Sequence, residues 1–294
     1  MSSWPHERAL LSQNFLRSSH LIASLLDRFD LGGDSTVYEI GPGEGLITGQ
    51  LAQRYREVVA IEKDARLAYR LQRTLRDYPN VTIHHGDFLR YPLPDNPYKV
   101  FANIPFNITS AIVARLTSGE HPIDEAYLTM QQEAAHMYLG QPRESLRSML
   151  LKPWFELKIV HRFRRADFVP TPRVDVVMLR LRKRGPPLVS RADRQLFRDF
   201  VVYMFTHWQP HHDTPLSDLF TRQQRRFMER ELGLRLDVKP TSISLGDWLA
   251  LFDQLKQVSN AQTRQRLAGS EHCLLHQQCG LQKIHRTRTV ERKL

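Results

Sequence analysis

A four-residue segment in the first half of the chain carries groups that could act on an amine. The segment reads Asn103, Ile104, Pro105 and Phe106, directly after a short β-branched run. An adenine amino nitrogen is a poor nucleophile because its lone pair is delocalised into the ring. The Asn103 side-chain carbonyl and the Ile104 backbone carbonyl could accept its two hydrogens and free the lone pair. The segment therefore predicts transfer of a methyl group to an adenine amine.

The other two residues of this segment suit the same chemistry. Phe106 offers an aromatic face on which an extruded base could stack, a contact worth about 1–3 kcal/mol. Pro105 fixes its own φ and would keep both acceptors aimed. The alternative is structural, because Asn-x-Pro is a common turn signal and Phe106 could belong to the core. The position of Asn103, 16 residues after Asp87 and at a predicted strand end, favours the catalytic interpretation.

Three earlier groups could hold the methyl donor. A glycine-rich loop, Glu39 to Gly45, follows a predicted strand and opens a helix, so Gly41 and Gly43 would let backbone amides approach a ligand. Glu62 ends the next strand, where a carboxylate can bind a ribose diol. Asp87 follows the third strand and could accept a hydrogen bond from an adenine amino group. This order is more typical of S-adenosylmethionine than of NAD, although two solvated acids remain the alternative.

The elements that must position these groups alternate along the chain. Predicted strands are Thr36–Ile40, Val58–Ile61, Val81–Ile83, Lys99–Ala102 and Ala126–Thr129. Predicted helices between them are Leu46–Arg54, Ala65–Arg76 and Thr109–Leu116. This alternation predicts an α/β fold with a parallel, doubly wound sheet. Two later runs, Trp154–Phe163 and Val174–Leu181, are expected to complete the sheet as a hairpin.

The second half of the chain changes character after Gly185. Pro186 and Pro187 cannot continue a helix or a central strand. We therefore expect a catalytic domain over residues 1–185, a small helical RNA-binding domain over 186–257, and a basic, flexible tail over 258–294. The helical domain rests on three amphipathic patterns, at Arg191–Phe205, Thr221–Leu232 and Ser244–Leu255.

Composition limits the function classes. The chain has 294 residues, 41% of them hydrophobic, and a formal net charge of +11. Such a charge favours a polyanion such as nucleic acid, although a merely solvated basic surface is the alternative. There is no disulfide framework, signal peptide or apolar run long enough to cross a membrane, so a cytoplasmic location is expected.

Two groups of residues in the second half invite more specific hypotheses. Residues 161–184 are rich in arginine, and we predict RNA contacts for five of them against the alternative of a solvated face. These are Arg162, Arg164, Arg165, Arg173 and Arg182. The tail has the metal-ligand types Cys273, His276, Cys279 and His285. Their spacing matches no zinc signature, so we expect no metal site and favour a basic arm.

Several motifs together resemble a known group of enzymes. They are Gln13–Leu16, Glu39–Gly45, Ile61–Glu62, Gly86–Leu89, Asn103–Phe106, Gln132–Ala135 and Phe168–Asp175. With them the chain resembles the rRNA adenine N6-dimethyltransferase superfamily, most closely its Erm branch of macrolide-resistance methyltransferases. The resemblance covers about Ser12 to Leu255. It implies a Rossmann-like class I S-adenosylmethionine-dependent methyltransferase sheet with a small C-terminal α-helical domain.

The resemblance also implies roles for individual residues. Asn14 and Leu16 would line the cofactor site, Gly41 would meet the methionine end, and Asn103 would touch both cofactor and target. Glu62 would bind the ribose and Asp87 the adenine. The implied reaction is methylation of one adenine in 23S rRNA, which confers macrolide, lincosamide and streptogramin B resistance. A monomer without an obligate protein partner or membrane is expected.

The substrate leaves alternatives open. The housekeeping branch, which dimethylates two adenines of 16S rRNA, usually has Leu and Tyr where Ile104 and Phe106 stand here. A non-catalytic RNA-binding or transcription factor on the same fold is a further alternative. DNA amino-methyltransferases usually have two prolines after the Asn or Asp, which this chain lacks. The sequence does not specify which adenine is modified, how many methyl groups it receives, or whether free rRNA or a pre-ribosomal particle is the substrate.

Overall fold

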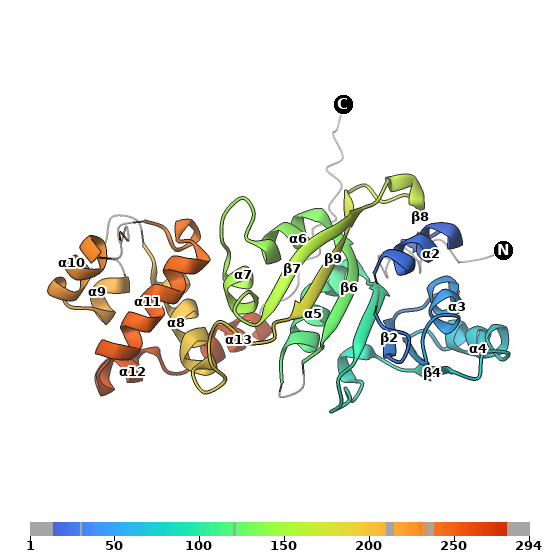
Figure 1. Cartoon of the computed structure of the whole chain (residues 1–294), viewed down its shortest axis with the longest axis horizontal. Helices are drawn as coiled ribbons and strands as arrows, with labels where there is room; N and C mark the ends of the chain where they lie inside the picture. The colour runs from blue at the N-terminus through green and yellow to red at the C-terminus, as the bar shows by residue number, and fades with distance from the viewer. Residues whose placement is uncertain are drawn as a thin grey trace. The chain divides into compact units, whose positions relative to one another are not determined.

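The computed structural model describes residues 14–29, 31–119, 122–209, 215–231, 233 and 238–280 (Figure 1). The chain folds as two compact units. Unit 1 comprises Met1–Pro142 and Leu151–Pro187, and unit 2 comprises Arg143–Leu150 and Leu188–Leu294. The expected division into a catalytic domain up to residue 185, an RNA-binding domain and a tail stays a prediction.

A seven-stranded sheet forms the centre of unit 1, in the order β4-β3-β2-β5-β6-β9-β7 (Figure 1). Its strands are β2 (Thr36–Ile40), β3 (Glu57–Glu62), β4 (Val81–His85), β5 (Lys99–Asn103), β6 (Glu125–Gln131), β7 (Phe155–Arg162) and β9 (Val176–Lys183). β2 to β6 run parallel, whereas β9 pairs antiparallel with both β6 and β7. The predicted α/β fold, including the hairpin that completes the sheet, is confirmed.

Helices follow the strands as the periodicity predicted. Those of unit 1 are α2 (Ser19–Arg28), α3 (Leu46–Ala52), α4 (Ala65–Thr74), α5 (Thr109–Thr117) and α6 (Gln132–Leu139), with 3-10 turns η1 (Phe88–Arg90), η2 (Phe106–Ile108) and η3 (Arg165–Asp167). Side-chain caps set where some of them begin. Asp64 accepts hydrogen bonds from the backbone amides of Arg66 and Leu67, which fixes the start of α4 immediately after β3.

A second, two-stranded sheet joins distant parts of unit 1. β1 (Phe15–Leu16) pairs antiparallel with β8 (Phe168–Val169). Arg17 N also donates to Asp167 O at 3.0 Å. The periodicity did not predict these strands, because two residues are too few to show an alternation. The pairing holds the N-terminal segment beside the large sheet.

One apolar core lies between the large sheet and this N-terminal segment. Leu16, Phe101, Tyr127, Phe168 and Met178 are among its buried members. The Phe29 ring, just after α2, stacks on Tyr127 with centroids 4.7 Å apart. The continuous apolar runs of the central strands reflect burial on both faces, as parallel sheets require.

Unit 2 is helical in its described part. It contains α8 (Arg194–His207), α9 (Pro215–Leu219), α10 (Arg222–Glu231), η4 (Pro240–Ser242), α11 (Leu245–Val258), α12 (Ala261–Leu267) and α13 (Ser270–Gly280), while α7 (Leu146–Leu151) begins in this unit. Its core is aromatic: Phe200 meets Trp248 edge-on at 5.6 Å, and Phe197 meets Phe252 edge-on at 5.1 Å. The predicted small C-terminal helical domain is thus present.

Part of the expected basic tail is helical. Residues 261–280 form α12 and α13, and Leu267 is fully buried. Asp199 on α8 accepts hydrogen bonds from Glu271 N at 2.9 Å and Gly269 N at 3.3 Å. The Arg198 guanidinium pairs with the Glu271 carboxylate. The sequence patterns did not predict these helices, and residues 281–294 lie outside the described part.

Two absences hold for the part of the chain that the structure describes. No helix there is both long and apolar enough to cross a membrane. No group of three or more His, Cys, Asp or Glu side chains there could hold a metal ion. Of the candidate zinc ligands, Cys273 is exposed with a free thiol, and His285 lies outside the described residues.

Candidate functional site

The predicted site residues meet at the carboxyl ends of four parallel strands. Gly41 follows β2, Glu62 ends β3, Asp87 comes two residues after β4, and Asn103 ends β5. Backbone hydrogen bonds hold these ends together, from Gly41 N to Ile61 O at 3.0 Å and from Gly86 N to Glu62 O at 2.8 Å. Open α/β sheets bind ligands at this edge. The topology therefore brings together residues that lie up to 62 positions apart in the sequence.

A cavity of about 300 Å³ opens at this edge. Its wall includes Gly41, Glu62, Asp87 and Pro105, together with Ile108. It holds two of the predicted cofactor carboxylates and one glycine of the loop. Lys63, Asp64, Asn107 and Ile108 also line it and were not predicted. They are neighbours of predicted residues, and nothing in their types distinguished them from other loop residues.

Glu62 is a buried carboxylate that supports the glycine loop. Its Oε2 accepts a hydrogen bond from Gly43 N at 3.1 Å, and its Oε1 accepts one from Asp64 N at 2.8 Å. Burial raises the pKa of Glu62, partly offset by these backbone hydrogen bonds. A carboxylate has about four acceptor positions. Positions that these backbone amides do not occupy are left for the hydroxyls of a ribose.

Asp87 is more open and is held as an anion. Its Oδ1 accepts from Leu89 N at 3.0 Å, which caps η1, and its Oδ2 pairs with Lys63 Nζ at 2.9 Å. The hydrogen bond from Lys63 lowers the pKa of Asp87, with a smaller contribution from Leu89 N. An ionised carboxylate is an acceptor only. It therefore suits an amino group as its ligand.

The glycine loop leaves room for a ligand at one position and not at another. Gly43 has φ 60°, and a Cβ there would lie 2.4 Å from the Phe15 ring. Gly41 has φ 66°, but a Cβ there would meet nothing within 4 Å. A positive φ favours glycine at both positions. The space beside Gly41 opens on the cavity, so it fits a close approach by a cofactor.

Glu39 begins the predicted glycine-rich motif, and the sequence assigned it no role of its own. It lies on β2 beneath the loop and is 1% exposed. Burial, with a further contribution from the negative charge of Glu62, raises its pKa to about 8. Its Oε2 is buried without a hydrogen-bond partner among the described residues. The sequence offered only its place before the glycine loop, which does not separate a buried acid from a solvated one.

The side-chain amide of Asn103 has a bonded nitrogen and, among the described residues, an unbonded oxygen. Its Nδ2 donates to Asn14 O at 2.6 Å, so the segment before β1 sets the orientation of the amide. Its Oδ1 is buried and has no hydrogen-bond partner within the described ranges. A buried acceptor left unpaired costs about 1–3 kcal/mol, so the orientation points to a ligand that supplies the donor. An exocyclic amine would do so.

The rest of the catalytic segment is buried or half-buried. Ile104 is 2% exposed. Phe106 is half-buried and packs against the apolar core of unit 1. Its carbonyl accepts a hydrogen bond from Thr109 Oγ1 at 3.1 Å, which ties η2 to α5. The proposed stacking of a base on Phe106 stays a prediction, to be made by the part of the ring left open.

A second cavity, of about 610 Å³, lies next to the first. Its wall includes Leu16, Gly41 and Asn103, as well as Phe15 and Val169 from the paired β1 and β8. Gly41 lines both cavities. A ligand bound beside Glu62 and Asp87 could therefore extend past Gly41 towards Asn103.

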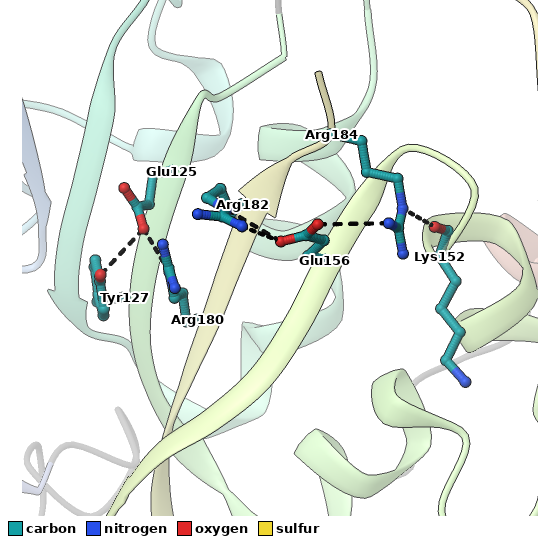
Figure 2. Close-up of polar contacts among 7 residues, drawn as sticks. All are labelled: Glu125, Tyr127, Lys152, Glu156, Arg180, Arg182 and Arg184. Atoms are coloured by element: carbon teal, nitrogen blue, oxygen red, sulfur yellow. Dashed lines mark hydrogen bonds and ion pairs between the residues drawn. The ribbon is translucent and has the colours of Figure 1, made fainter. Parts of the chain in front are cut away.

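Four of the five arginines predicted to contact RNA have acidic or polar partners. Arg162 donates to Gln132 Oε1, Arg164 pairs with Asp167, and Arg165 pairs with Asp175 at 2.8 Å. Figure 2 shows Arg182 and Arg184 converging on Glu156, while Arg180 bonds Glu125 beside Tyr127. The acids reduce the net positive charge of this surface. RNA contact by Arg162, Arg164, Arg165, Arg173 and Arg182 stays a prediction.

Comparison with known proteins matches the whole arrangement to one family. The profile of the "Ribosomal RNA adenine dimethylase" family covers residues 6–257. An "rRNA adenine N-6-methyltransferase" of Saccharopolyspora erythraea is 33% identical over 251 residues, a match that spans 85% of this chain and 66% of that protein. "Ribosomal RNA small subunit methyltransferase A" of Streptococcus pyogenes is 32% identical over 263 residues, spanning 84% of this chain and 91% of that protein.

Solved structures agree. The crystal structure of the 23S rRNA methyltransferase ErmE has a TM-score of 0.75 and 33% identity, and the match covers 83% of this chain and all of that one. A dimethyladenosine transferase from Plasmodium falciparum, at 19% identity and a TM-score of 0.66, shares the fold. The match covers 83% of this chain and 98% of that one.

Proposed function

The chain belongs to the ribosomal RNA adenine dimethylase family of S-adenosyl-L-methionine-dependent enzymes, and we propose that its substrate is one adenine of 23S rRNA. The observation that carries the chemistry is the buried, unpaired Oδ1 of Asn103 at the end of β5. The likeness to ErmE in both sequence and structure supports the choice of rRNA. Modification of that adenine would confer macrolide, lincosamide and streptogramin B resistance.

In this mechanism the chain's residues orient two reactants. The cofactor supplies the methyl group as an electrophile when it is bound. Glu62 would accept hydrogen bonds from the ribose hydroxyls, Asp87 would accept one from the adenine amino group, and the open space beside Gly41 would admit the methionine end of the cofactor. Holding reacting atoms in line converts a bimolecular step into an effectively unimolecular one.

The target amine is activated by acceptors rather than by a strong base. Asn103 Oδ1 and the Ile104 carbonyl would accept hydrogen bonds from its two N–H groups, so the nitrogen would become more nearly tetrahedral and its lone pair would be freed to take the methyl group. One of the two hydrogens would then leave as a proton to water. Asn14 keeps Asn103 from rotating by accepting its amide hydrogen. Phe106 supports the base, and Pro105 fixes the loop between them. Fixed dipoles of this kind cost no reorganisation at the moment of reaction.

The remaining parts of the proposal concern the setting of the reaction. We expect a cytoplasmic monomer that acts without an obligate protein partner. Arg162, Arg164, Arg165, Arg173 and Arg182 would approach the RNA backbone, and for Arg164, Arg165 and Arg182 this requires that their acidic partners be displaced or bridged. The expected location rests on relatives whose names place their action on rRNA, and the expected RNA contacts rest on the formal charge of +11.

Primer extension on rRNA from cells that express the protein tests the substrate. We expect one strong stop in 23S rRNA, absent when Asn103→Ala is expressed at the same level, together with reduced macrolide susceptibility. The second candidate is 16S rRNA, favoured by the Streptococcus relative that matches along 91% of its length. A stop only in 16S rRNA would replace the proposal with that candidate. No stop in either RNA, together with no transfer of labelled methyl groups to RNA, would argue for a non-catalytic binding protein.

A further inference from the structure

A polar cavity of about 280 Å³ lies within unit 2, away from the residues assigned to catalysis. One wall comes from α9 and the start of α10, with Ser217, Thr221 and Gln224. The facing wall comes from α12 and the residues before it, with Gln262 and Arg266 among them. The family profile ends at residue 257. The cavity is therefore completed by a segment beyond the part that this chain shares with its family.

The two walls are fixed to each other. Arg266 Nη1 donates to Asp218 O at 2.9 Å and lies 3.5 Å from Asp218 Oδ1. Asp218 Oδ2 in turn accepts a hydrogen bond from the Tyr203 hydroxyl at 3.0 Å. The next residue of α12, Leu267, is fully buried. These contacts hold the cavity open as a built feature of the unit.

The wall offers hydrogen-bonding groups of both kinds. Ser217 Oγ is buried and has no partner among the described residues, so it is left to bond a ligand. The side chains around it are hydroxyls and amides, namely those of Thr221, Gln224, Asn260, Gln262 and Thr263. Hydroxyls and amides match the edge of an unpaired base and the hydroxyls of its ribose. The volume, near the lower limit of ~300 Å³ for ligand pockets, suits a single nucleotide.

The charge around the cavity fits a nucleic acid as well. The two helices that flank it, α10 and α12, carry six arginines against two glutamates. The arginines are Arg222, Arg225, Arg226, Arg230, Arg264 and Arg266, and the acids are Glu229 and Glu231. Arg266 and Arg230 are already paired with Asp218 and Glu231. Phosphates on either side of a bound nucleotide would neutralise charges among the other four arginines and release counterions.

We propose that this cavity binds an unpaired nucleotide of the rRNA substrate, other than the target adenine. It gives the enzyme a second point of recognition outside the catalytic segment. The inference rests on the proposed function, because that function supplies the RNA. Its effect belongs to substrate binding and not to methyl transfer, since none of the reacting groups lies in the cavity wall.

The test compares two double variants of the full chain. Ser217→Ala with Gln262→Ala removes two hydrogen-bonding groups from the wall. Gln223→Ala with Gln265→Ala removes two exposed amides from α10 and α12, the helices that flank the cavity, without touching its wall. Circular dichroism checks that both variants fold. Kinetics with a fragment of 23S rRNA and labelled S-adenosylmethionine then give kcat and KM for each substrate.

We expect the cavity variant to raise KM for the RNA fragment about tenfold, the loss of two hydrogen bonds of ordinary strength. Its kcat and its KM for S-adenosylmethionine should match those of the wild type and of the control variant. An unchanged KM for RNA would overturn the inference while leaving the proposed function intact. If the wild type methylated no RNA, the proposed function would fail. The Kd of the same RNA fragment, measured directly, would then test the cavity. A Kd about tenfold higher for the cavity variant than for the control would support the inference, and equal Kd values would overturn it.

Discussion

At the scale of single residues, the Asn103 side chain is oriented by one hydrogen bond and keeps its other polar atom for a substrate. Its nitrogen is tied to Asn14 O at 2.6 Å, while its oxygen is buried without a partner among the described residues. We predict that Asn103→Ala lowers kcat for methyl transfer by about 100-fold or more, because an aimed dipole is lost. The Kd for S-adenosylmethionine should change by no more than about threefold, since the contacts of Glu62 and Asp87 remain.

Labelled-methyl transfer and calorimetric titration of the cofactor measure the two effects separately. Asn96→Ala, at an exposed loop asparagine, is the matched control and should behave as wild type. Unchanged turnover in Asn103→Ala would remove this residue from the mechanism.

Part of the Phe106 ring packs against the core and part is left open at the site. Substitutions that keep the ring and substitutions that remove it should therefore have different effects. Phe106→Tyr should retain activity, because stacking needs the ring and not its substituent. Phe106→Ala should raise KM for RNA about tenfold or more, because base–aromatic stacking is worth about 1–3 kcal/mol. It should also destabilise unit 1 through lost packing. Kinetics at a temperature well below the melting point separate the two effects, and a purely structural role would leave KM for RNA unchanged there.

Glu39 links the stability of the site to pH. Its pKa is raised to about 8 in the folded chain by burial, from an ordinary value of 4.5. Its folded state therefore binds a proton that the unfolded state releases, and stability is lost as pH rises from about 4.5 through about 8. We predict that Glu39→Gln removes this dependence. The free energy of unfolding of the variant minus that of the wild type should increase by more than about 1 kcal/mol between pH 5.5 and pH 8.5.

Urea denaturation at several pH values measures that shift. Glu62, whose pKa is also raised, is present in both proteins, so the part of its titration that does not depend on the charge of Glu39 cancels in the comparison. Parallel pH profiles for wild type and variant would mean that Glu39 is ionised in the folded chain.

Residue types and spacing predicted Glu62, Asp87 and Asn103 at the site, because each ends or follows a recognisable strand. They could not predict Lys63 as the partner of Asp87, or Glu39 as a buried acid. Both depend on how close separate strands come, and on what covers them. A lysine after a strand has the same sequence signature whether it meets a carboxylate or only water.

At the scale of elements, the glycine loop between β2 and α3 separates a folding constraint from a binding one. A Cβ at Gly43 would collide with Phe15, whereas one at Gly41 would occupy open space beside the cavities. We predict that Gly43→Ala lowers the melting temperature more than Gly41→Ala does, because it adds a clash to the strain of a positive φ. Gly41→Ala should instead weaken S-adenosylmethionine binding about tenfold or more, with a smaller loss of stability.

Thermal unfolding and calorimetric titration of both variants check this division. Gly119→Ala, at a glycine with φ 88° and open space outside the site, serves as a control for strain alone. Equal cofactor affinity in Gly41→Ala and Gly119→Ala would mean that the cofactor does not approach Gly41.

The sheet could be predicted from sequence because five of its strands are apolar runs separated by helical patterns. β1 and β8 could not, since each has two residues and their pairing joins positions 15 and 169. α12 and α13 were missed for another reason. Their sequence is polar, and their docking depends on a few buried groups such as Leu267 and Glu271 rather than on a broad apolar face.

At the scale of the whole molecule, the chain extends beyond its family match with a segment that is part of unit 2. Leu267 is fully buried, and the Asp199 and Arg198 contacts hold the start of α13 on α8. We predict that Leu267→Ala costs about 2–5 kcal/mol, the usual range for a buried leucine. Hydrogen exchange should show lost protection in α8 and α12 and unchanged protection in β2 to β6.

Leu275→Ala, at an exposed leucine of α13, provides the control and should cost less than about 0.5 kcal/mol. Equal protection of α8 in the Leu267 variant and in the wild type would mean that the segment after residue 257 does not stabilise the rest of unit 2.

The pairing of β1 with β8 also sets an order in time. Leu16 and Phe15 line the second cavity beside Val169, and they reach that position only by pairing with residues about 150 positions later in the chain. Because synthesis proceeds from the N-terminus, the ribosome must translate most of unit 1 before this wall can close. The glycine loop and Glu62 are made much earlier. A nascent chain would therefore have the carboxylates for the cofactor well before it has the wall that orients Asn103.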